Sequence, residues 1–370
     1  MRLGVVTASY PRFPGDPAGQ FVAAHVAALR AAGHRVEVVA AGGGPGPATP
    51  EAATDGVHRI ASPLFYRGGA PDALERAPLV SALAAAAFTA RLTAAATLRA
   101  RRWDAVVAHW LVPSALAALP GGRPLLAIAH GGDVFTLRRL GLLAPVLHAL
   151  ARRRARLVLV SEQLRGVARA AAPGLAAWLD AAVVQPMGVD TARFAALPRA
   201  PSDPPSVLCA ARLVPIKGVD VALAAMRHLR AAADLVIAGD GPERARLAAY
   251  APAGAARWLG AVTTDRRDQL LAAASVVVVP SRVTPGGRTE GTPAIALEAL
   301  AAGVPVVASA VGGLRELRDL PGVQLVPPDD PRALAAAIDQ WIAQPPAAPA
   351  LRAAVARFDW RTIAPRLLPP

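Results

Sequence analysis

A chain of 370 residues is longer than one ordinary domain, and with 54% hydrophobic residues it has enough apolar material for two buried cores. The formal net charge is +14 and is carried almost wholly by arginine; Lys217 is the only lysine and asparagine is absent. This composition, rich in Ala, Pro and Gly, is typical of G+C-rich coding, so the charge alone does not identify an anionic partner. Aromatic residues are scarce, and no basic and aromatic platform argues for nucleic-acid binding.

Three features bear on the compartment, which we expect to be the cytoplasm. The first apolar run is short and leads directly into Pro and Gly, so no signal peptide is expected. Residues 80–98 come nearest to a membrane span, but Arg91 interrupts them and we expect no transmembrane helix. The single cysteine, Cys209, excludes an internal disulfide and, within an apolar run, is predicted to be a packed thiol.

Apolar runs of strand length alternate with Ala- and Leu-rich helical runs along the whole chain, which is the pattern of parallel α/β sheets. The expected strands of the first half are residues 3–8, 36–40, 105–108, 125–129 and 157–160, with helices at 21–32, 81–100 and 144–153. The expected strands of the second half are residues 207–211, 235–238, 276–279, 304–308 and 323–326. Between the halves, the Pro-rich residues 198–205 are expected to form a semi-rigid linker.

Two Rossmann-like domains are therefore predicted, and such sheets bind ligands at the carboxyl ends of their strands. After the first strand, Gly19 and Gln20 open the next helix, where a glycine lets a ligand approach the backbone; a plain flexible loop fits equally well. His130 follows the strand at 125–129 and precedes two glycines, so it is well placed to touch a substrate. The alternative is a structural histidine that caps a turn, and His109 is a second candidate.

Residues 138–156 combine leucines with several arginines. A basic amphipathic helix of this kind can lie on an anionic membrane surface. The alternative is a surface helix that packs on the sheet and keeps its charges in water.

In the second half, Arg212 and Lys217 flank a short Pro-containing loop after a strand. Two cations that reach one point from such a loop suit a diphosphate. Gly241, in the turn GDGPER after the next strand, could line the ligand, although packing alone explains it.

Residues 290–303 carry the start and stop signals of a helix. Thr292 is the expected N-cap, Pro293 the first helical residue and Gly303 the end. The backbone from Thr292 through Ala294 and Ile295 would then form an anion site at the helix N-terminus, suited to a phosphate.

Two carboxylates frame this helix. Glu290 lies in the loop before it, and Glu298 lies inside it among apolar residues. Because an unpaired buried carboxylate is costly, Glu298 should have a partner, either the hydroxyls of a ligand or an arginine of the core.

With these residues assembled, the chain resembles glycosyltransferase family 4, retaining enzymes of the GT-B fold. The matching segments, in the family's order, are ARLVPIKGVD, GDGPE, WLGAV, VVVVPS, EGTPAIALEALAAGVPVVAS with the pair Glu290 and Glu298, and the GG-x2-E ending at Glu316. HGGD and YPRFPGDPAGQF match the more variable first half, and the final FDWRTIAPRLL resembles the family's closing helix. The resemblance covers nearly the whole chain.

The resemblance implies an α/β chain with two Rossmann-like parallel-sheet domains that face each other across a cleft. It implies an acceptor-binding domain at residues 1–197, a linker at 198–205, a nucleotide-sugar-binding domain at 206–355, and a C-terminal helix at 356–370 that returns to the first domain. Sugar identity is read near the Gly-rich loop before Glu290, which carries Arg288, and it stays open.

The resemblance also assigns roles to single residues. Arg212 and Lys217 would hold the donor diphosphate, Glu298 would accept hydrogen bonds from the ribose, and Glu290 would contact the donor sugar. His130 would lie near the sugar, and Gly19 beside the diphosphate. The remaining substrate-binding residues are Gln20, Gly241, Thr292, Pro293, Ala294 and Ile295.

The implied reaction moves a hexose from a nucleoside-diphosphate sugar to a hydroxyl acceptor with retention of configuration. In this family the leaving phosphate is thought to take the acceptor's proton, so no enzyme nucleophile is needed. No D-x-D motif indicates a metal, and no cofactor is expected. The acceptor would be a glycan, a glycolipid or a small molecule, with contact to an anionic membrane at its inner face.

Three alternatives remain open at this point. One is a nucleotide-sugar epimerase of the same fold, and another is a non-catalytic nucleotide-sugar-binding protein. The third, a nicotinamide-dependent oxidoreductase, is disfavoured because no G-x-G-x-x-G turn follows the first strand.

Overall fold

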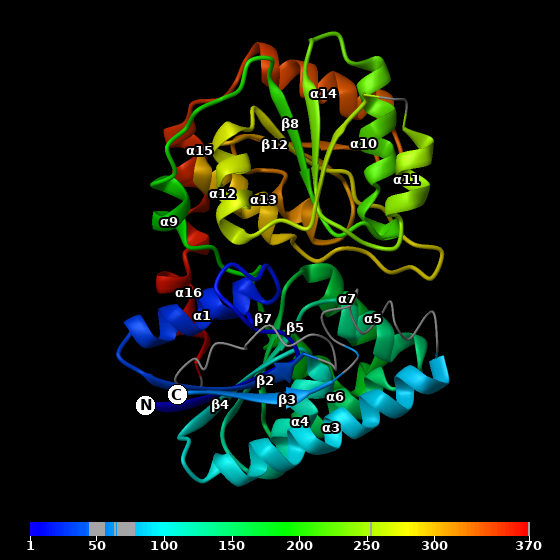
Figure 1. Cartoon of the computed structure of the whole chain (residues 1–370). Coiled ribbons are helices and arrows are strands. Elements are labelled where there is room, and N and C mark those ends of the chain that lie inside the picture. Colours follow the sequence, from blue (N-terminus) through cyan, green and yellow to red (C-terminus); the bar gives the residue numbers. More distant parts are fainter. Residues whose placement is uncertain (44–55, 63, 65–77, 252–253, 369–370) are drawn as a thin grey trace. The chain divides into compact units, whose positions relative to one another are not determined.

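The structure is a computed structural model that describes residues 1–43, 56–62, 64, 78–251 and 254–368 (Figure 1). The chain forms two compact units, Met1–Pro186 with Trp360–Pro370, and Met187–Asp359. Residues 369–370, at the end of the predicted closing helix, lie outside the described residues.

The first unit is built on a parallel sheet whose described part has seven strands in the order β3-β2-β1-β4-β5-β6-β7. The strands are β1 (Arg2–Thr7), β2 (Arg35–Gly42), β3 (Val57–Ala61), β4 (Ala105–His109), β5 (Leu125–Ala129), β6 (Arg156–Leu159) and β7 (Val183–Val184). The helices are α1 (Gln20–Ala31), α3 (Pro78–Ala100), η1 (Leu111–Ala115), α4 (Leu116–Ala118), η2 (Leu119–Gly121), α5 (Gly132–Arg139), α6 (Leu143–Arg152), α7 (Glu162–Ala171), η3 (Pro173–Leu175), α8 (Ala176–Asp180) and α16 (Trp360–Leu367).

The second unit is built on a parallel sheet with six described strands in the order β10-β9-β8-β11-β12-β13. The strands are β8 (Ser206–Ala210), β9 (Asp234–Ala238), β10 (Arg257–Gly260), β11 (Val276–Val279), β12 (Val306–Ser309) and β13 (Val323–Val326). The helices are α9 (Thr191–Ala195), η4 (Pro215–Lys217), α10 (Val219–Ala225), η5 (Met226–His228), α11 (Arg244–Tyr250), α12 (Thr264–Ala273), α13 (Ala294–Ala302), η6 (Gly312–Leu317), α14 (Pro331–Ala343), α15 (Ala348–Val355) and η7 (Ala356–Phe358).

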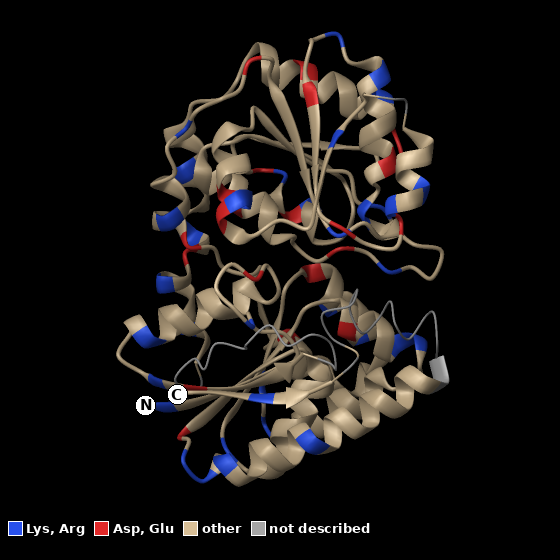
Figure 2. Cartoon of the chain, in the orientation of Figure 1, with Lys and Arg blue, Asp and Glu red and all other residues tan. Residues whose placement is uncertain are grey.

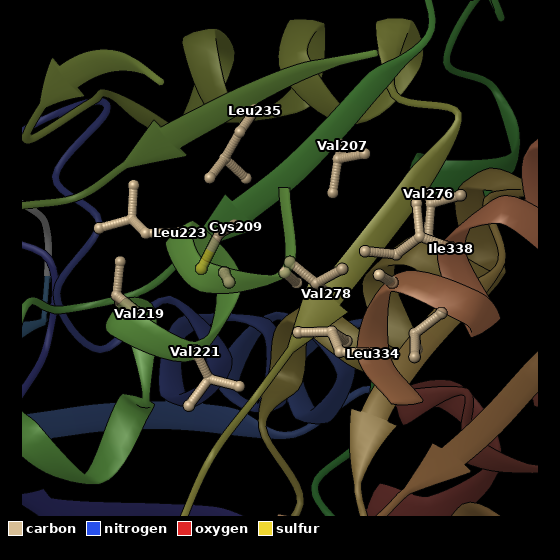
Figure 3. Close-up of a cluster of buried hydrophobic side chains, with 14 of the residues drawn as sticks. Val207, Cys209, Val219, Val221, Leu223, Leu235, Val276, Val278, Leu334 and Ile338 are labelled. Carbon is tan, nitrogen blue, oxygen red and sulfur yellow. The ribbon is translucent and has the colours of Figure 1, made fainter. Parts of the chain in front are cut away.

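Helices cover both faces of each sheet, so the central strands are buried throughout. All five residues of β5 are buried, as are all four valines of β11. Figure 3 shows the core of the second unit, where valines of β8 and β11 meet Leu334 and Ile338 of α14. Cys209 lies in this core with 1% exposure, which confirms the predicted packed thiol; burial raises its pKa to about 12.

All ten predicted strands are present, with small shifts at their ends. The strands that the sequence did not predict are β3, β7 and β10, and each lies at an edge of its sheet. The side chains of β3 and β10 are at least partly exposed, so these sequences lack the continuous apolar run that marks a central parallel strand, and β7 has only two residues.

The chain passes from one unit to the other at Pro186–Met187, ahead of the expected linker. Residues 198–205 are fastened to the second unit instead. The guanidinium of Arg199 donates to the carbonyls of Leu271, Ala272 and Ala274 at 2.9, 3.0 and 2.9 Å. This arginine pins the Pro-rich segment to the end of α12, so the segment is part of a folded unit.

The C-terminal helix returns to the first unit, as expected. It begins at Trp360, and residues up to Asp359 remain in the second unit. Helix α16 packs against α1, and Arg156 donates to the carbonyls of Leu368 and Arg366 at 2.7 and 2.9 Å.

Helix α3 differs from the expectation about membrane spans. Among the described residues, Val80–Ala100 is long and apolar enough to cross a membrane by length and composition, and α5 with α6 would also qualify if taken as one span. One face of α3 is buried against the sheet through Phe88 and Leu92. The opposite face is open, with Val80, Leu83 and Leu98 about three-quarters exposed.

Residues 138–156 run from the end of α5 through α6 to the start of β6, and α5 and α6 are bent by 118° relative to each other. The apolar side of α6, with Val146, Leu147 and Leu150, is buried inside the first unit. The alternative of a packed surface helix is therefore the observed one. Figure 2 shows Lys and Arg spread over both units.

Candidate active site

The sole lysine, Lys217, and the loop glutamate Glu290 lie together in the second unit. Lys217, at the end of η4, places its Nζ 2.9 Å from Oε2 of Glu290. Both side chains are largely buried, with 17% and 14% exposure, so this ion pair is poorly screened by water.

Backbone contacts explain why Lys217 occupies this position. Gly218 follows it with a φ of +60°, and a Cβ there would lie 1.9 Å from the carbonyl oxygen of Pro280. Only a glycine allows this approach, which presses the loop after β8 against the end of β11. Arg212 lies at the start of the same loop.

A second close approach fixes Glu290. Its carbonyl accepts a hydrogen bond from the N–H of Gly313 at 3.1 Å. At Gly312, where φ is +52°, a Cβ would lie 2.0 Å from the same carbonyl oxygen. The GG pair of the GG-x2-E segment therefore sets the position of Glu290 through the backbone.

Helix α13 begins one residue later than the sequence predicts. Pro293 is the N-cap and Ala294 the first helical residue, so the predicted cap at Thr292 is wrong. The hydroxyl of Thr292 donates instead to the carbonyl of Gly313 at 3.5 Å. The N–H groups of Ala294 and Ile295 have no intrahelical acceptor, and they form the positive end of a nine-residue helix.

Glu298 is buried in α13, as predicted, and it has a protein partner. Nη1 of Arg267, on α12, lies 3.4 Å from its Oε1, and the same guanidinium also pairs with Asp268 at 3.3 Å. Of the two predicted kinds of partner, the structure contains the core arginine. Burial raises the pKa of Glu298, and Arg267 opposes that shift.

Gly241 supports the Arg212 loop. A Cβ on Gly241 would lie 2.4 Å from the carbonyl oxygen of Leu213. The N–H of Leu213 donates to the carbonyl of Asp240 at 2.9 Å, and the N–H of Glu243 donates to the carbonyl of Leu213 at 3.0 Å. These contacts favour the packing explanation of the GDGPER turn.

In the first unit, His130 lies directly after β5. The backbone N–H groups of His130 and Gly131 donate to Oδ1 of Asp133 at 3.1 and 2.9 Å, while the backbone N–H of Leu111 donates to Oδ2 at 2.7 Å. The buried Asp133 therefore shapes the strand-end loop and leaves the imidazole of His130 to other partners. Burial raises the pKa of Asp133, and hydrogen bonds from backbone N–H groups, those of Leu111 and His130 among them, act against this shift.

Gly19 and Gln20 lie at the start of α1. Gly19 is the N-cap, with a φ of +67°, and a Cβ there would lie 2.6 Å from the carbonyl carbon of Ser9. The amide of Gln20 donates to the carbonyl of Asp16. The side chain of Gln20 therefore ties the start of α1 to the loop that precedes it.

Sequence reasoning missed two groups beside these residues. It did not identify Arg267, because no local signal links α12 to α13. It ranked His109 second and omitted His25, although both rings are hydrogen-bonded in series to His130. The position of His109 at the end of β4, the neighbour of β5, is a signal that could have paired it with His130.

Comparison with known proteins agrees with this architecture. Residues 18–193 match the family described as Glycosyltransferase Family 4, and residues 204–344 match Glycosyl transferases group 1. Glycogen synthase of Mycobacterium tuberculosis is 32% identical over 397 residues, which cover 98% of this chain and 92% of that protein. A GDP-mannose-dependent alpha-(1-6)-phosphatidylinositol monomannoside mannosyltransferase of the same species is 34% identical over 58% of this chain and 59% of its own.

Solved structures share the fold. HepE from Anabaena, in complex with UDP and glucose, has a TM-score of 0.69 at 19% identity and covers 99% of this chain and 98% of its own. Sucrose-phosphate synthase from Thermosynechococcus elongatus has a TM-score of 0.68 at 20% identity, with 99% of this chain and 97% of its own covered.

Two parallel Rossmann-like sheets and a returning C-terminal helix define a GT-B protein. The chain belongs to glycosyltransferase family 4. It is a retaining glycosyltransferase that transfers a sugar from a nucleotide-sugar donor, rather than an epimerase or a non-catalytic binder.

Proposed function

We propose that the loops of the second unit hold the nucleotide-sugar donor, with Lys217 and Arg212 on the diphosphate. The observation that carries this proposal is the ion pair between Lys217 and Glu290. A partly buried ammonium fixed beside a carboxylate is ready to exchange one anionic partner for another.

Under this proposal each remaining group has one task. The first-turn N–H groups of Ala294 and Ile295 bind phosphate through the helix N-terminus. Glu298 accepts hydrogen bonds from the ribose while Arg267 compensates its charge. Glu290 contacts hydroxyls of the transferred sugar, and His130 donates to another of them.

The chemistry follows from where charge develops. The leaving group is a nucleoside diphosphate, so cations and N–H dipoles that face it stabilise the negative charge that grows as the bond to the sugar breaks. The sugar passes through an oxocarbenium-like state, which a carboxylate at Glu290 would favour. Because fixed cations bear this charge, we propose that turnover needs no metal ion, and a chelator should leave the rate unchanged.

The relatives indicate the classes of acceptor. One is named a glycogen synthase and another transfers mannose to a phosphatidylinositol mannoside, so glycans and glycolipids are both represented. We propose a glycan or glycolipid acceptor for this chain and an intracellular site of action. The exposed apolar face of α3, around Val80 and Leu83, would contact a membrane that carries a lipid-linked acceptor.

The proposed donor site can be tested by calorimetry with UDP, GDP and ADP. One of these should bind to the wild-type protein, and Lys217→Ala should weaken that binding by about 1.5–3 kcal/mol, the contribution of a charged hydrogen bond. Arg332→Ala, which removes an exposed arginine at the start of α14, is the matched control and should bind like wild type. Unchanged affinity in Lys217→Ala would remove Lys217 from the donor site.

A further inference from the structure

Three histidine rings form a continuous hydrogen-bonded series inside the first unit. Nδ1 of His25, on α1, lies 3.1 Å from Nε2 of His109, at the end of β4. Nδ1 of His109 lies 3.1 Å from Nε2 of His130, directly after β5. The series therefore runs from the interior of the unit to a residue of the proposed active site.

The inner end of this series is closed by the C-terminal helix. The ring of Trp360, on α16, stacks on His25 with centroids 4.3 Å apart and planes 7° from parallel. Both His25 and Trp360 are fully or almost fully buried. At the outer end, Trp110 and Phe21 lie against His130, with centroids 4.7 and 5.2 Å from it.

All three rings are neutral near pH 7. Burial lowers the pKa of His25 to about 3 and that of His130 to about 3, and it lowers the pKa of His109 well below its ordinary value. A neutral imidazole has one N–H donor and one acceptor nitrogen. His109 uses both of its nitrogens, so it must donate to one neighbour and accept from the other.

The series therefore has only two possible directions. In one, protons lie on Nδ1 of all three rings; in the other, they lie on Nε2 of all three. His25 Nε2 is buried and has no hydrogen-bond partner among the described residues. The second direction leaves an N–H without an acceptor there, whereas the first leaves only a lone pair, and orphaned buried N–H groups are the rarer and costlier case.

The nitrogens face each other in pairs and do not converge on one point. Consistently, no group of three ligating side chains suited to a metal ion occurs in the described part of the chain. The arrangement is a hydrogen-bond series.

We propose that His109, supported by His25, is a positioning residue that holds His130 with its proton on Nδ1, so that His130 presents an N–H donor to a sugar hydroxyl. The fixed tautomer follows from the series itself; its use on the sugar rests on the proposed function. Within the described residues, no hydrogen bond occupies Nδ1 of His130. The return of α16 to the first unit then has a catalytic consequence, because Trp360 packs the far end of the series.

The test is long-range 1H–15N NMR of the full-length protein with 15N-labelled histidine rings, without substrate. His130, assigned with His130→Ala, should show a protonated Nδ1 and an unprotonated Nε2. His109→Phe keeps an aromatic ring in the buried cluster but removes the donor to His130, so both tautomers of His130 should then appear. His148→Gln, at an exposed histidine bonded to the carbonyl of Ala144, should leave the His130 signals unchanged.

Activity adds a separate outcome. In His109→Phe, kcat should fall about tenfold, the scale of one hydrogen bond, while KM for the donor stays constant. His130 protonated on Nε2 in the wild type, or an unchanged tautomer in His109→Phe, would overturn the proposal; the wild-type spectrum decides this even where His109→Phe fails to fold. The expected spectra with an unchanged kcat would leave the series intact and refute the role of His130 in the proposed function.

Discussion

The ion pair between Lys217 and Glu290 allows a sharp test of how the proposed donor site divides its work. In the proposed site Lys217 binds the diphosphate and Glu290 binds the transferred sugar, yet in the structure these two side chains form an ion pair with each other at 2.9 Å. Glu290→Gln removes the carboxylate charge and keeps an amide oxygen as a weaker acceptor. Lys217 then becomes more available to a phosphate.

The size of the effect follows from the geometry. Unit charges at 2.9 Å attract by about 6 kcal/mol at an effective dielectric constant of about 20, and desolvation of both groups offsets most of this. What remains is about 1.5–3 kcal/mol for a charged hydrogen bond. An ammonium has three donors and can keep part of its bond to Glu290, so we take the lower end and expect about tenfold tighter binding of the nucleoside diphosphate.

Turnover should change in the opposite direction, with kcat about 10²-fold lower if Glu290 acts on the sugar in the transition state. Calorimetry and steady-state rates on Glu290→Gln measure both effects. Glu162→Gln is the matched control, because it removes a carboxylate from an exposed ion pair with Arg165 on α7. Weaker nucleoside diphosphate binding in Glu290→Gln would refute the competition for Lys217, and a normal kcat would take Glu290 out of the chemistry.

Three other predictions concern charge and exposure. Burial raises the pKa of Glu298, so its folded carboxylate lowers stability as pH rises above the ordinary carboxyl value. Glu298→Gln should therefore raise the thermal midpoint at pH 7 and weaken nucleoside diphosphate binding; a lower midpoint, or unchanged binding, would contradict this. Burial lowers the pKa of His109, so the protein loses stability as the pH falls below about 6.5. In His109→Phe this loss is absent, so the slope of the unfolding free energy against pH, between about pH 6 and 4, should be smaller by about 1.4 kcal/mol per pH unit. An unchanged slope would count against a neutral buried ring at His109. If α3 contacts a membrane, the double variant Val80→Ser, Leu83→Ser should co-sediment less with anionic vesicles, while the control Tyr250→Ser on the second unit should bind like wild type. Equal vesicle binding by the double variant and the control would remove α3 from that role.

The fold was predictable because its central strands are buried on both faces and appear as uninterrupted apolar runs. The segment 276–279, four valines, was predicted with its observed ends. The edge strand β10 has the sequence RWLG and half-exposed side chains, so it lacks that signal. Helix α13 was predicted with its start one residue early, because Thr292 has the chemistry of a cap but its hydroxyl is used by Gly313.

Residues of the candidate site that lie in loops directly after strands were predictable, and contacts that depend on the packing of one element against another were not. Lys217 and Glu290 both lie in loops after strands, and their proximity agrees with the expected site. The partner of Glu298 is Arg267 on α12, which only the packing of two helices selects. Likewise, nothing in the sequence of α1 distinguishes His25 from a histidine on a helix surface, because its burial depends on β4 and α16.

The proposed site residues of the two units control charge in different ways, and the proposed reaction explains the difference. The second unit holds ionised groups in pairs, Lys217 with Glu290 and Arg267 with Glu298, which suits a diphosphate whose negative charge grows during bond breaking. The first unit holds three histidines whose burial suppresses protonation. A cationic imidazole beside the sugar would repel the positive charge of an oxocarbenium-like state. A neutral His130 with a fixed N–H can orient a hydroxyl without that repulsion. The buried imidazole series therefore keeps positive charge away from the sugar, while the ion pairs of the second unit supply cations to the phosphate.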